Sequence, residues 1–249
     1  MTTIGAPAKL TLSLRVTGVR DDGYHLIDAE MITLDLADRL DIIESSAAGA
    51  TSITVSGPFA AGVPTDGSNL VAKALDRIGR PATVHIDKQI PSQGGLGGGS
   101  ADAAAILRWA GIDDVDLAVR LGADVPFCLR GGRARVRGIG EVLDPLPIVP
   151  CPVTLCVPPF GISTVRCYRA WDELGGPTAD GPNDLEPAAV SVEPRLREWL
   201  DTFGEVTGSA AVLAGSGSTM FVHGHHREAI DVIGRSLPGT VVLLADARG

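Results

Sequence analysis

The stretch IPSQGGLGGGSADAAAIL, residues 90–107, constrains this 249-residue chain more than any other part of it. Its glycines surround a single leucine: Gly94, Gly95, Leu96, Gly97, Gly98 and Gly99. A glycine loses more backbone freedom on folding than any other residue, so such a run indicates close backbone approach to a ligand or another segment. Ser100 is a good N-cap or first-turn residue, and residues 101–109 favour a helix. The sequence therefore predicts a helix that begins where the glycines stop.

The start of this predicted helix is a candidate phosphate site. Unpaired N–H groups and the positive end of the helix dipole would point into the glycine loop. Two other phosphate motifs are excluded, because the chain has no G-x-x-x-x-G-K-[ST] and Gly95-x-Gly97 lacks the third glycine of a dinucleotide fingerprint. A flexible linker is the alternative, although linkers seldom lead straight into a well-made helix start.

Composition and charge narrow the possible partners. The formal net charge of −9 argues against a nucleic-acid surface. The longest apolar stretch, residues 142–159, is broken by prolines and cannot span a membrane. Four cysteines without C-x-x-C spacing, and no secretory leader, predict reduced thiols and a cytoplasmic protein. We expect a small-molecule partner and leave open whether the chain is a monomer or a homodimer.

Residues 6–16 alternate in the manner of a half-buried strand. One face holds Leu10, Leu12, Leu14 and Val16, and the other holds Lys9, Thr11, Ser13 and Arg15. The polar face either meets solvent or lines a site. Asp22-Gly23 then signals a hairpin, and Tyr24 and His25 form a ring pair that either packs under this turn or binds a ligand.

Further elements follow in order. Strands are predicted over residues 32–43, 51–56 and 83–88, and an amphipathic helix over 67–78. A short helix from Val115 ends at Gly122, and Asp124 follows as either a turn residue or half of an ion pair. After a proline-rich passage near Pro150, we predict a strand over 153–157, a helix that opens at Ser163 or Thr164, and a final strand over 240–245.

Three motifs in this order resemble those of the GHMP kinases, which include galactokinase and the homoserine and mevalonate kinases. They are A-P-A-K ending at Lys9, the glycine stretch from Pro91, and the turn Gly215-Ser216-Gly217. R-x-D-G-Y-H, G-A-D-V-P-F and N-D-L-E-P resemble one branch of the family. That branch phosphorylates the 2-hydroxyl of 4-diphosphocytidyl-2-C-methyl-D-erythritol in the non-mevalonate isoprenoid pathway. Thr11 departs from it, since the branch normally has asparagine there.

The resemblance implies roles for individual residues. Lys9 and Asp124 would be catalytic, with the lysine keeping the carboxylate ionised so that it can take the hydroxyl proton. ATP would be bound by Asn69, Leu70, Pro91, Gly94, Gly95, Leu96, Gly97, Gly98, Gly99 and Ser100, and Ser100 would also be a ligand of Mg²⁺. The substrate would contact Thr11, Tyr24, His25, Tyr168, Gly215, Ser216 and Gly217, with the three rings holding the cytosine.

The resemblance also implies an α+β fold with two lobes. Residues 1–150 would form an N-terminal, ATP-binding lobe with a mostly antiparallel sheet, and residues 151–249 a ferredoxin-like C-terminal lobe. Two alternatives stay open: another small-molecule GHMP kinase of the homoserine or mevalonate type, and a nucleotide-binding paralogue with weak activity. The first alternative is disfavoured by Tyr24-His25 and residues 183–187. The second is disfavoured by the presence of both Lys9 and Asp124.

Overall fold

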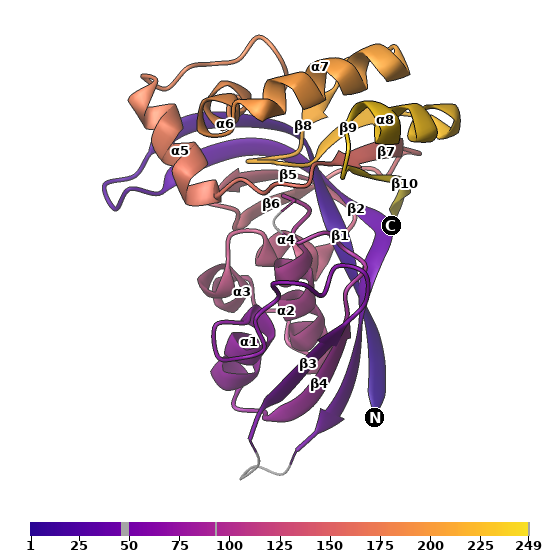
Figure 1. The fold of residues 1–249 in the computed structure, drawn as a ribbon. Helices are drawn as coiled ribbons and strands as arrows, with labels where there is room; N and C mark the ends of the chain where they lie inside the picture. The colour runs from indigo at the N-terminus through magenta and orange to yellow at the C-terminus, as the bar shows by residue number, and fades with distance from the viewer. Residues whose placement is uncertain (46–49, 93, 249) are drawn as a thin grey trace.

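The protein is represented by a computed structural model that describes residues 1–45, 50–92 and 94–248 (Figure 1). Gln93, within the glycine stretch, and Gly249, at the end of the second predicted lobe, lie outside the described residues. The first part of the chain folds as β1 (Thr2–Val19), β2 (His25–Glu44), β3 (Ser52–Ser56), α1 (Leu70–Ile78), β4 (Ala82–Asp87), α2 (Gly98–Trp109), α3 (Val115–Leu121), α4 (Val125–Arg130), β5 (Arg133–Gly138) and β6 (Val142–Pro145). The second part folds as β7 (Pro152–Val157), α5 (Thr164–Glu173), α6 (Glu186–Val192), α7 (Arg195–Thr207), β8 (Val212–Leu213), β9 (Met220–His223), the 3₁₀ helix η1 (Arg227–Ala229), α8 (Ile230–Ser236) and β10 (Val241–Arg248).

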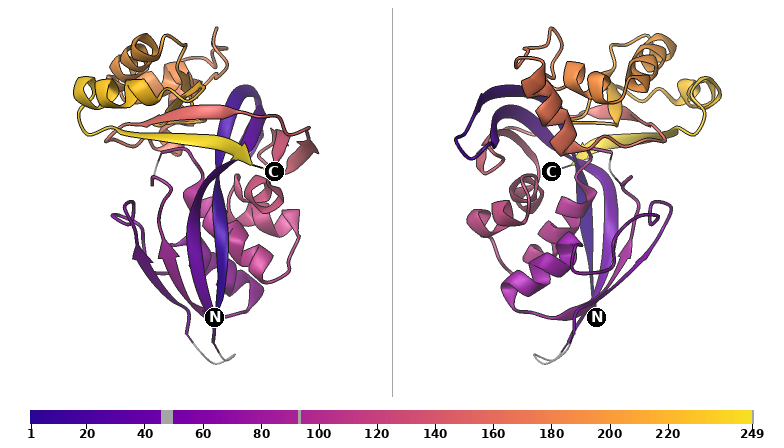
Figure 2. Two further views of the ribbon diagram at one scale, coloured as in Figure 1. Left: turned by 90° about the vertical axis from the view of Figure 1, so that its right-hand side faces the viewer. Right: turned by 60° about the vertical axis from the view of Figure 1, so that its left-hand side comes forward.

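The helices form two groups at opposite ends of the molecule (Figures 1 and 2). Helices α1 to α4 lie together beside β1 to β4, and α5 to α8 cover the strands at the other end. The strands of this second end are antiparallel neighbours in the order β10-β7-β9-β8. Along the chain this end runs strand, helices, two strands, helix and strand, and with that spatial order of strands it makes a ferredoxin-like arrangement. The predicted α+β class is confirmed. Within the described ranges, every helix is too short or too polar to cross a bilayer.

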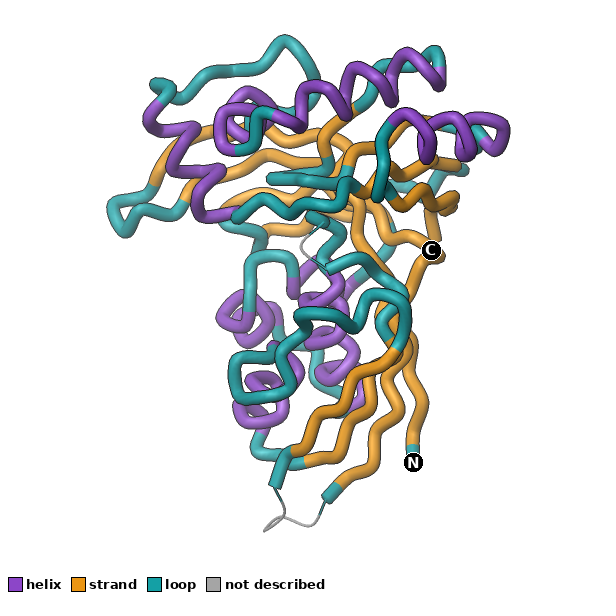
Figure 3. The backbone as a smooth tube through the Cα atoms, in the orientation of Figure 1, coloured by secondary structure: helices purple, strands orange, loops and turns teal. Residues whose placement is uncertain are grey.

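The antiparallel hairpin of β1 and β2 connects the two ends (Figure 3). Leu10 and Ile32 belong to a hydrophobic cluster with α2, whereas Leu14 and Ile27 belong to a second cluster with α5 to α7. The register of the pair shifts between Thr11 and Ser13, which is where β1 passes from one cluster to the other. The division of function at residue 150 stays a prediction.

Helix α2 begins earlier than the sequence predicted. Its first residues are Gly98 and Gly99, and its N-cap is Gly97, with φ +69°. The prediction that the helix starts after the glycines was therefore wrong, while Ser100 does fall in the first turn. The alanines that follow are fully buried against β1, α1 and α4, because their small side chains allow close approach.

Candidate functional site

Lys9 and Asp124 form an ion pair, with Lys9 Nζ 3.3 Å from Asp124 Oδ2. Lys9 lies on β1, and Asp124 is the N-cap residue of α4, where its side chain makes no capping bond. The lysine side chain is 6% exposed and the aspartate 33%, so the carboxylate is the more open partner. Lys9 Nζ also donates to Thr11 Oγ1 at 3.1 Å. A carboxylate held beside a buried ammonium can accept a proton from a hydroxyl that binds next to both.

The polar face of β1 is not solvated at this position. Lys9 is 5% exposed and Thr11 1% exposed. The glycine loop covers this part of the strand, since Lys9 N donates to Leu96 O at 3.0 Å. A Cβ on Gly97 would lie 2.8 Å from Lys9 Cγ, so glycine is required where the loop meets the lysine. The loop and the lysine are thereby held at one fixed separation.

A cavity of about 470 Å³ opens in front of the ion pair. It brings together most of the residues predicted to act on the substrate: Lys9, Thr11, Tyr24, His25, Asp124, Tyr168, Gly215 and Ser216. Of the residues predicted to bind ATP, Gly95 alone is among those that line this cavity. Gly217 is buried instead, and a Cβ there would lie 2.8 Å from Leu213 Cδ1. Gly217 could therefore make its predicted contact with the substrate only through backbone atoms.

Aromatic rings line one part of the cavity, called its aromatic end below. His25 packs on Tyr168 with ring centroids 4.7 Å apart and planes inclined by 35°. Trp171 and the same imidazole are nearly perpendicular, and their ring centroids lie 5.7 Å apart. Tyr24 is 58% exposed, so it is not packed under the hairpin turn with His25, as one interpretation of the sequence had it. A packed ring pair with an exposed tyrosine in the same cavity suits the stacking of a planar heterocycle.

Asp172 completes this end of the site and was missed by the sequence analysis. Its Oδ1 lies 2.8 Å from His25 Nε2. Because residues four apart share one helical face, the spacing from Tyr168 to Asp172 on the predicted helix was a signal that could have found it. The partner, however, is 147 residues away in the sequence, and helical spacing alone does not identify it.

The predicted ATP residues surround the start of α2. Asn69 is the N-cap of α1: its Oδ1 accepts from Val71 N at 2.8 Å and its Nδ2 donates to Pro64 O at 2.7 Å. These bonds occupy its side chain, so its predicted contact with adenine would depend on the backbone or on rearrangement. Leu70 Cδ1 lies 3.7 Å from the position of a Cβ on Gly99, which places Leu70 beside the first turn of α2.

The remaining residues of the glycine loop anchor it to its surroundings. Leu96 is fully buried and Pro91 is buried, so their side chains serve packing. Gly94 O accepts from Thr219 N at 3.1 Å, which ties the loop to the second glycine-rich turn. A Cβ on Gly98 would lie 3.1 Å from Lys88 Nζ.

Below the loop lies a buried cluster that sequence reasoning did not identify. Lys88 Nζ contacts Asp38 Oδ2 and lies 2.9 Å from Asp102 Oδ2. Asp38 Oδ1 accepts from Gln89 N at 2.6 Å and Ile90 N at 2.8 Å, which fixes the chain as it enters the loop. Burial, opposed by the charge of Lys88, raises the pKa of Asp102 to about 7. Both ends of the loop are thus held by one polar cluster.

The polar groups near the start of α2 suit a metal ion that arrives already bound to a phosphate ligand. The described residues contain no group of three or more His, Cys, Asp or Glu side chains that could hold a metal. Ser100 Oγ faces Gly122, 3.9 Å from the position of a Cβ there. Mg²⁺ usually keeps waters and substrate phosphates among its ligands, so a single hydroxyl beside a phosphate loop is compatible with it.

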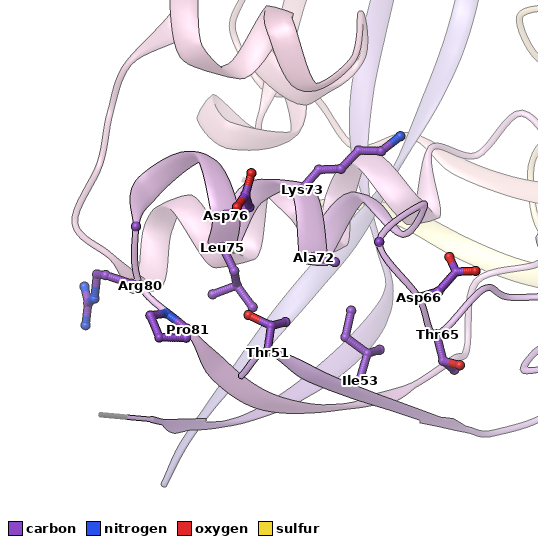
Figure 4. Close-up of a pocket in the computed structure, with 12 residues that line it drawn as sticks. Thr51, Ile53, Thr65, Asp66, Ala72, Lys73, Leu75, Asp76, Arg80 and Pro81 are labelled. Atoms are coloured by element: carbon purple, nitrogen blue, oxygen red, sulfur yellow. The ribbon is translucent and has the colours of Figure 1, made fainter. Parts of the chain in front are cut away.

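A larger cavity of about 640 Å³ lies elsewhere, between α1 and β3 (Figure 4). Leu75 on α1 faces Thr51 and Ile53 at β3 across it. Its lining includes none of the residues predicted to bind ATP or substrate or to act in catalysis. The residues predicted to act in catalysis and on the substrate are therefore concentrated in the smaller cavity.

Three comparisons with known proteins point to the same family. The profile of the family described as GHMP kinases N terminal domain matches residues 69–132. The 4-diphosphocytidyl-2-C-methyl-D-erythritol kinase of Jannaschia sp. is 41% identical over 241 residues, covering 87% of this chain and 86% of that protein. A crystal structure of 4-(cytidine 5'-diphospho)-2C-methyl-D-erythritol kinase is similar with a TM-score of 0.78 and 30% identity, covering 100% of both chains.

A homoserine kinase from Cytophaga hutchinsonii is also similar in structure. It gives a TM-score of 0.64 at 19% identity over 99% of this chain and 95% of that one. At that identity the likeness concerns the fold alone. The matches to the 4-diphosphocytidyl-2-C-methyl-D-erythritol kinases therefore bear on the substrate, whereas the match to the homoserine kinase does not.

Proposed function

This chain belongs to the 4-diphosphocytidyl-2-C-methyl-D-erythritol kinases of the GHMP kinase family, and we therefore propose that it transfers the terminal phosphoryl group of ATP to the 2-hydroxyl of 4-diphosphocytidyl-2-C-methyl-D-erythritol. The products are ADP and the 2-phosphate. The observation that supports this most directly is the Lys9–Asp124 ion pair in a cavity that Tyr24, His25 and Tyr168 also line.

Asp124 is the proposed general base. The 2-hydroxyl binds beside the Lys9–Asp124 pair, and Asp124 Oδ2 takes its proton as the oxygen attacks phosphorus. Lys9, 3.3 Å from that oxygen, offsets negative charge on the carboxylate and on the transferring phosphoryl group. Thr11 Oγ1, which accepts from Lys9 Nζ, keeps the ammonium directed into the cavity.

The nucleotide is proposed to bind at the glycine loop. Backbone N–H groups of residues 94–99 and the start of α2 face the phosphates, and the helix dipole favours the negative charge. Mg²⁺ bound with ATP neutralises phosphate charge, and Ser100 is the side chain we propose as its protein ligand. Contact between Gly97 and Lys9 then places the phosphate loop next to the catalytic pair.

The cytosine is proposed to occupy the aromatic end. His25 and Tyr168 present stacked rings, and Tyr24, at the mouth, is free to close on the opposite face of the base. Stacking of a base on an aromatic ring contributes about 1–3 kcal/mol. Homoserine and mevalonate have no ring that could stack on these side chains, which favours the cytidyl substrate over theirs.

Release of ADP on a panel of acceptors tests this function. The purified protein with ATP and Mg²⁺ is given the cytidyl compound, 2-C-methyl-D-erythritol 4-phosphate, homoserine or mevalonate. We expect rapid turnover of the cytidyl compound alone. Equal kcat/KM with homoserine or mevalonate would contradict the substrate assignment, and slow ADP release with every acceptor would favour a nucleotide-binding paralogue.

A further inference from the structure

Asn183 lies behind the cavity, and none of its atoms lines it. We propose that Asn183 is a positioning residue that fixes the backbone of the turn at residues 213–215 opposite Lys9. This inference rests on the kinase function proposed above and adds to it a residue that sets how the substrate is held.

The side-chain amide of Asn183 is fully engaged with this turn. Its Nδ2 donates to Leu213 O at 2.8 Å and to Gly215 O at 2.7 Å. Its Oδ1 accepts from Leu185 N at 2.9 Å. The residue is 1% exposed, so water cannot replace these bonds. Both amide hydrogens are therefore used on two carbonyl groups of one turn.

The turn held in this way touches the catalytic residues. Gly215 lines the cavity with φ +62°. The position of a Cβ on Gly215 lies 3.7 Å from Lys9 Nζ and 3.6 Å from Thr11 Oγ1. A displacement of Gly215 by even a fraction of an ångström changes the space between the turn and the ammonium, where the acceptor hydroxyl must lie.

The segment that carries Asn183 is itself fixed to the strand that carries Lys9. Leu14 N donates to Pro182 O, and Asp184 N donates to Leu14 O, each at 2.9 Å. Asn183 is therefore attached to β1 on one side and holds the turn on the other. Its side-chain length sets the separation of Lys9 and Gly215.

Only an amide fits this position. A carboxylate of the same shape cannot donate, and it would face two carbonyl oxygens. An apolar side chain would leave both buried carbonyls without a partner. The glycine loop has a further anchor besides its bond to Thr219 N, because Asp38 accepts from Gln89 N and Ile90 N where the chain enters the loop. Loss of the amide should therefore act more on the acceptor substrate than on ATP.

The test compares Asn183→Asp with Asp184→Asn, its matched control. Asp184 is 2% exposed, and its oxygens accept from Arg15 Nη1, Val16 N and Ala179 N, away from the turn. For Asn183→Asp we expect the KM of the cytidyl substrate to rise about tenfold or more, a lower kcat, and a KM for ATP within about threefold of wild type. Asp184→Asn should lower the Tm while both KM values stay near wild type.

A lower Tm with wild-type kcat and KM in the folded Asn183→Asp enzyme would overturn the proposal, because the residue would then be only structural. An equal rise of KM in Asp184→Asn would also overturn it. If Asn183→Asp fails to fold, Asn183→Ala takes its place, since it removes the amide without adding a charge. An unchanged KM in that folded variant would overturn the proposal in the same way. A wild-type protein inactive on the cytidyl compound refutes the proposed function, whereas active wild type with an unchanged variant refutes only this inference.

Discussion

His25 Nε2 lies 2.8 Å from Asp172 Oδ1, so a carboxylate on α5 holds the imidazole that follows the β1–β2 turn. A carboxylate can only accept, which means that Nε2 carries the hydrogen. In a neutral imidazole Nδ1 is then an acceptor, and a cytosine offers an amino group as donor. The pair thus fixes the position of the ring and keeps a hydrogen on Nε2.

Replacement of Asp172 by asparagine should weaken binding of the cytidyl substrate. The amide can present either a donor or an acceptor to Nε2, so the tautomer of His25 is no longer fixed. We expect the KM of that substrate to rise about tenfold, while the KM of ATP is unchanged. Steady-state kinetics of Asp172→Asn and of Glu173→Gln, an exposed neighbour paired with Arg169, give the comparison. Equal KM values in both variants would exclude a role for Asp172.

Asp124→Asn tests the proposed base. The amide keeps the shape of the side chain but cannot take the hydroxyl proton, so kcat should fall about 100-fold or more. Nucleotide affinity should change little, since the glycine loop is intact. Asp113→Asn, which removes an exposed carboxylate paired with Arg130, is the control. Near-normal turnover of Asp124→Asn would show that the carboxylate is structural.

Gly97→Ala should impair ATP binding. The added Cβ meets Lys9 Cγ at 2.8 Å and shifts either the loop or the lysine. Gly79→Ala is a matched control, because Gly79 has φ +66° and open space where its Cβ would lie. Both substitutions carry the backbone penalty of about 1–2 kcal/mol for a left-handed residue. Only Gly97→Ala should lower ATP affinity in a titration, and equal affinities would remove the loop from the site.

The cysteines should differ in reactivity. Burial raises the pKa of the Cys128, Cys156 and Cys167 thiols to about 12, so almost no thiolate is present at pH 8. Cys151 is half-buried, and burial raises its pKa less. We expect one thiol per native chain to react readily with a disulfide reagent, faster as the pH rises, and all four after unfolding. Fast reaction of native Cys151→Ser would contradict this assignment.

The sequence predicts those parts of the fold and site that depend on local pattern. Alternation identifies β1, the N-cap Ser163 matches the predicted start of α5, and Gly122 matches the predicted end of α3. The short helix α4 was not predicted, because Pro126 interrupts a run of only six residues. Asn69 shows another limit, since a motif residue proposed for ligand contact uses its side chain to cap a helix.

The pairings that shape the site are beyond local pattern. Lys88 meets Asp38 and Asp102 from positions 50 and 14 residues away. Asn183 reaches Leu213 and Gly215 across about 30 residues. Periodicity says which face of an element is polar, but it does not say which distant residue completes each bond. Those partners emerge only when the topology is known.

The hairpin of β1 and β2 has a consequence for how the molecule melts. Each strand contributes side chains to both hydrophobic clusters, so neither cluster can lose its packing while the other keeps an intact hairpin. Two cores that share their central strands should therefore unfold cooperatively, in one calorimetric transition. A ligand that stabilises either end should then protect the whole chain from heat and proteolysis.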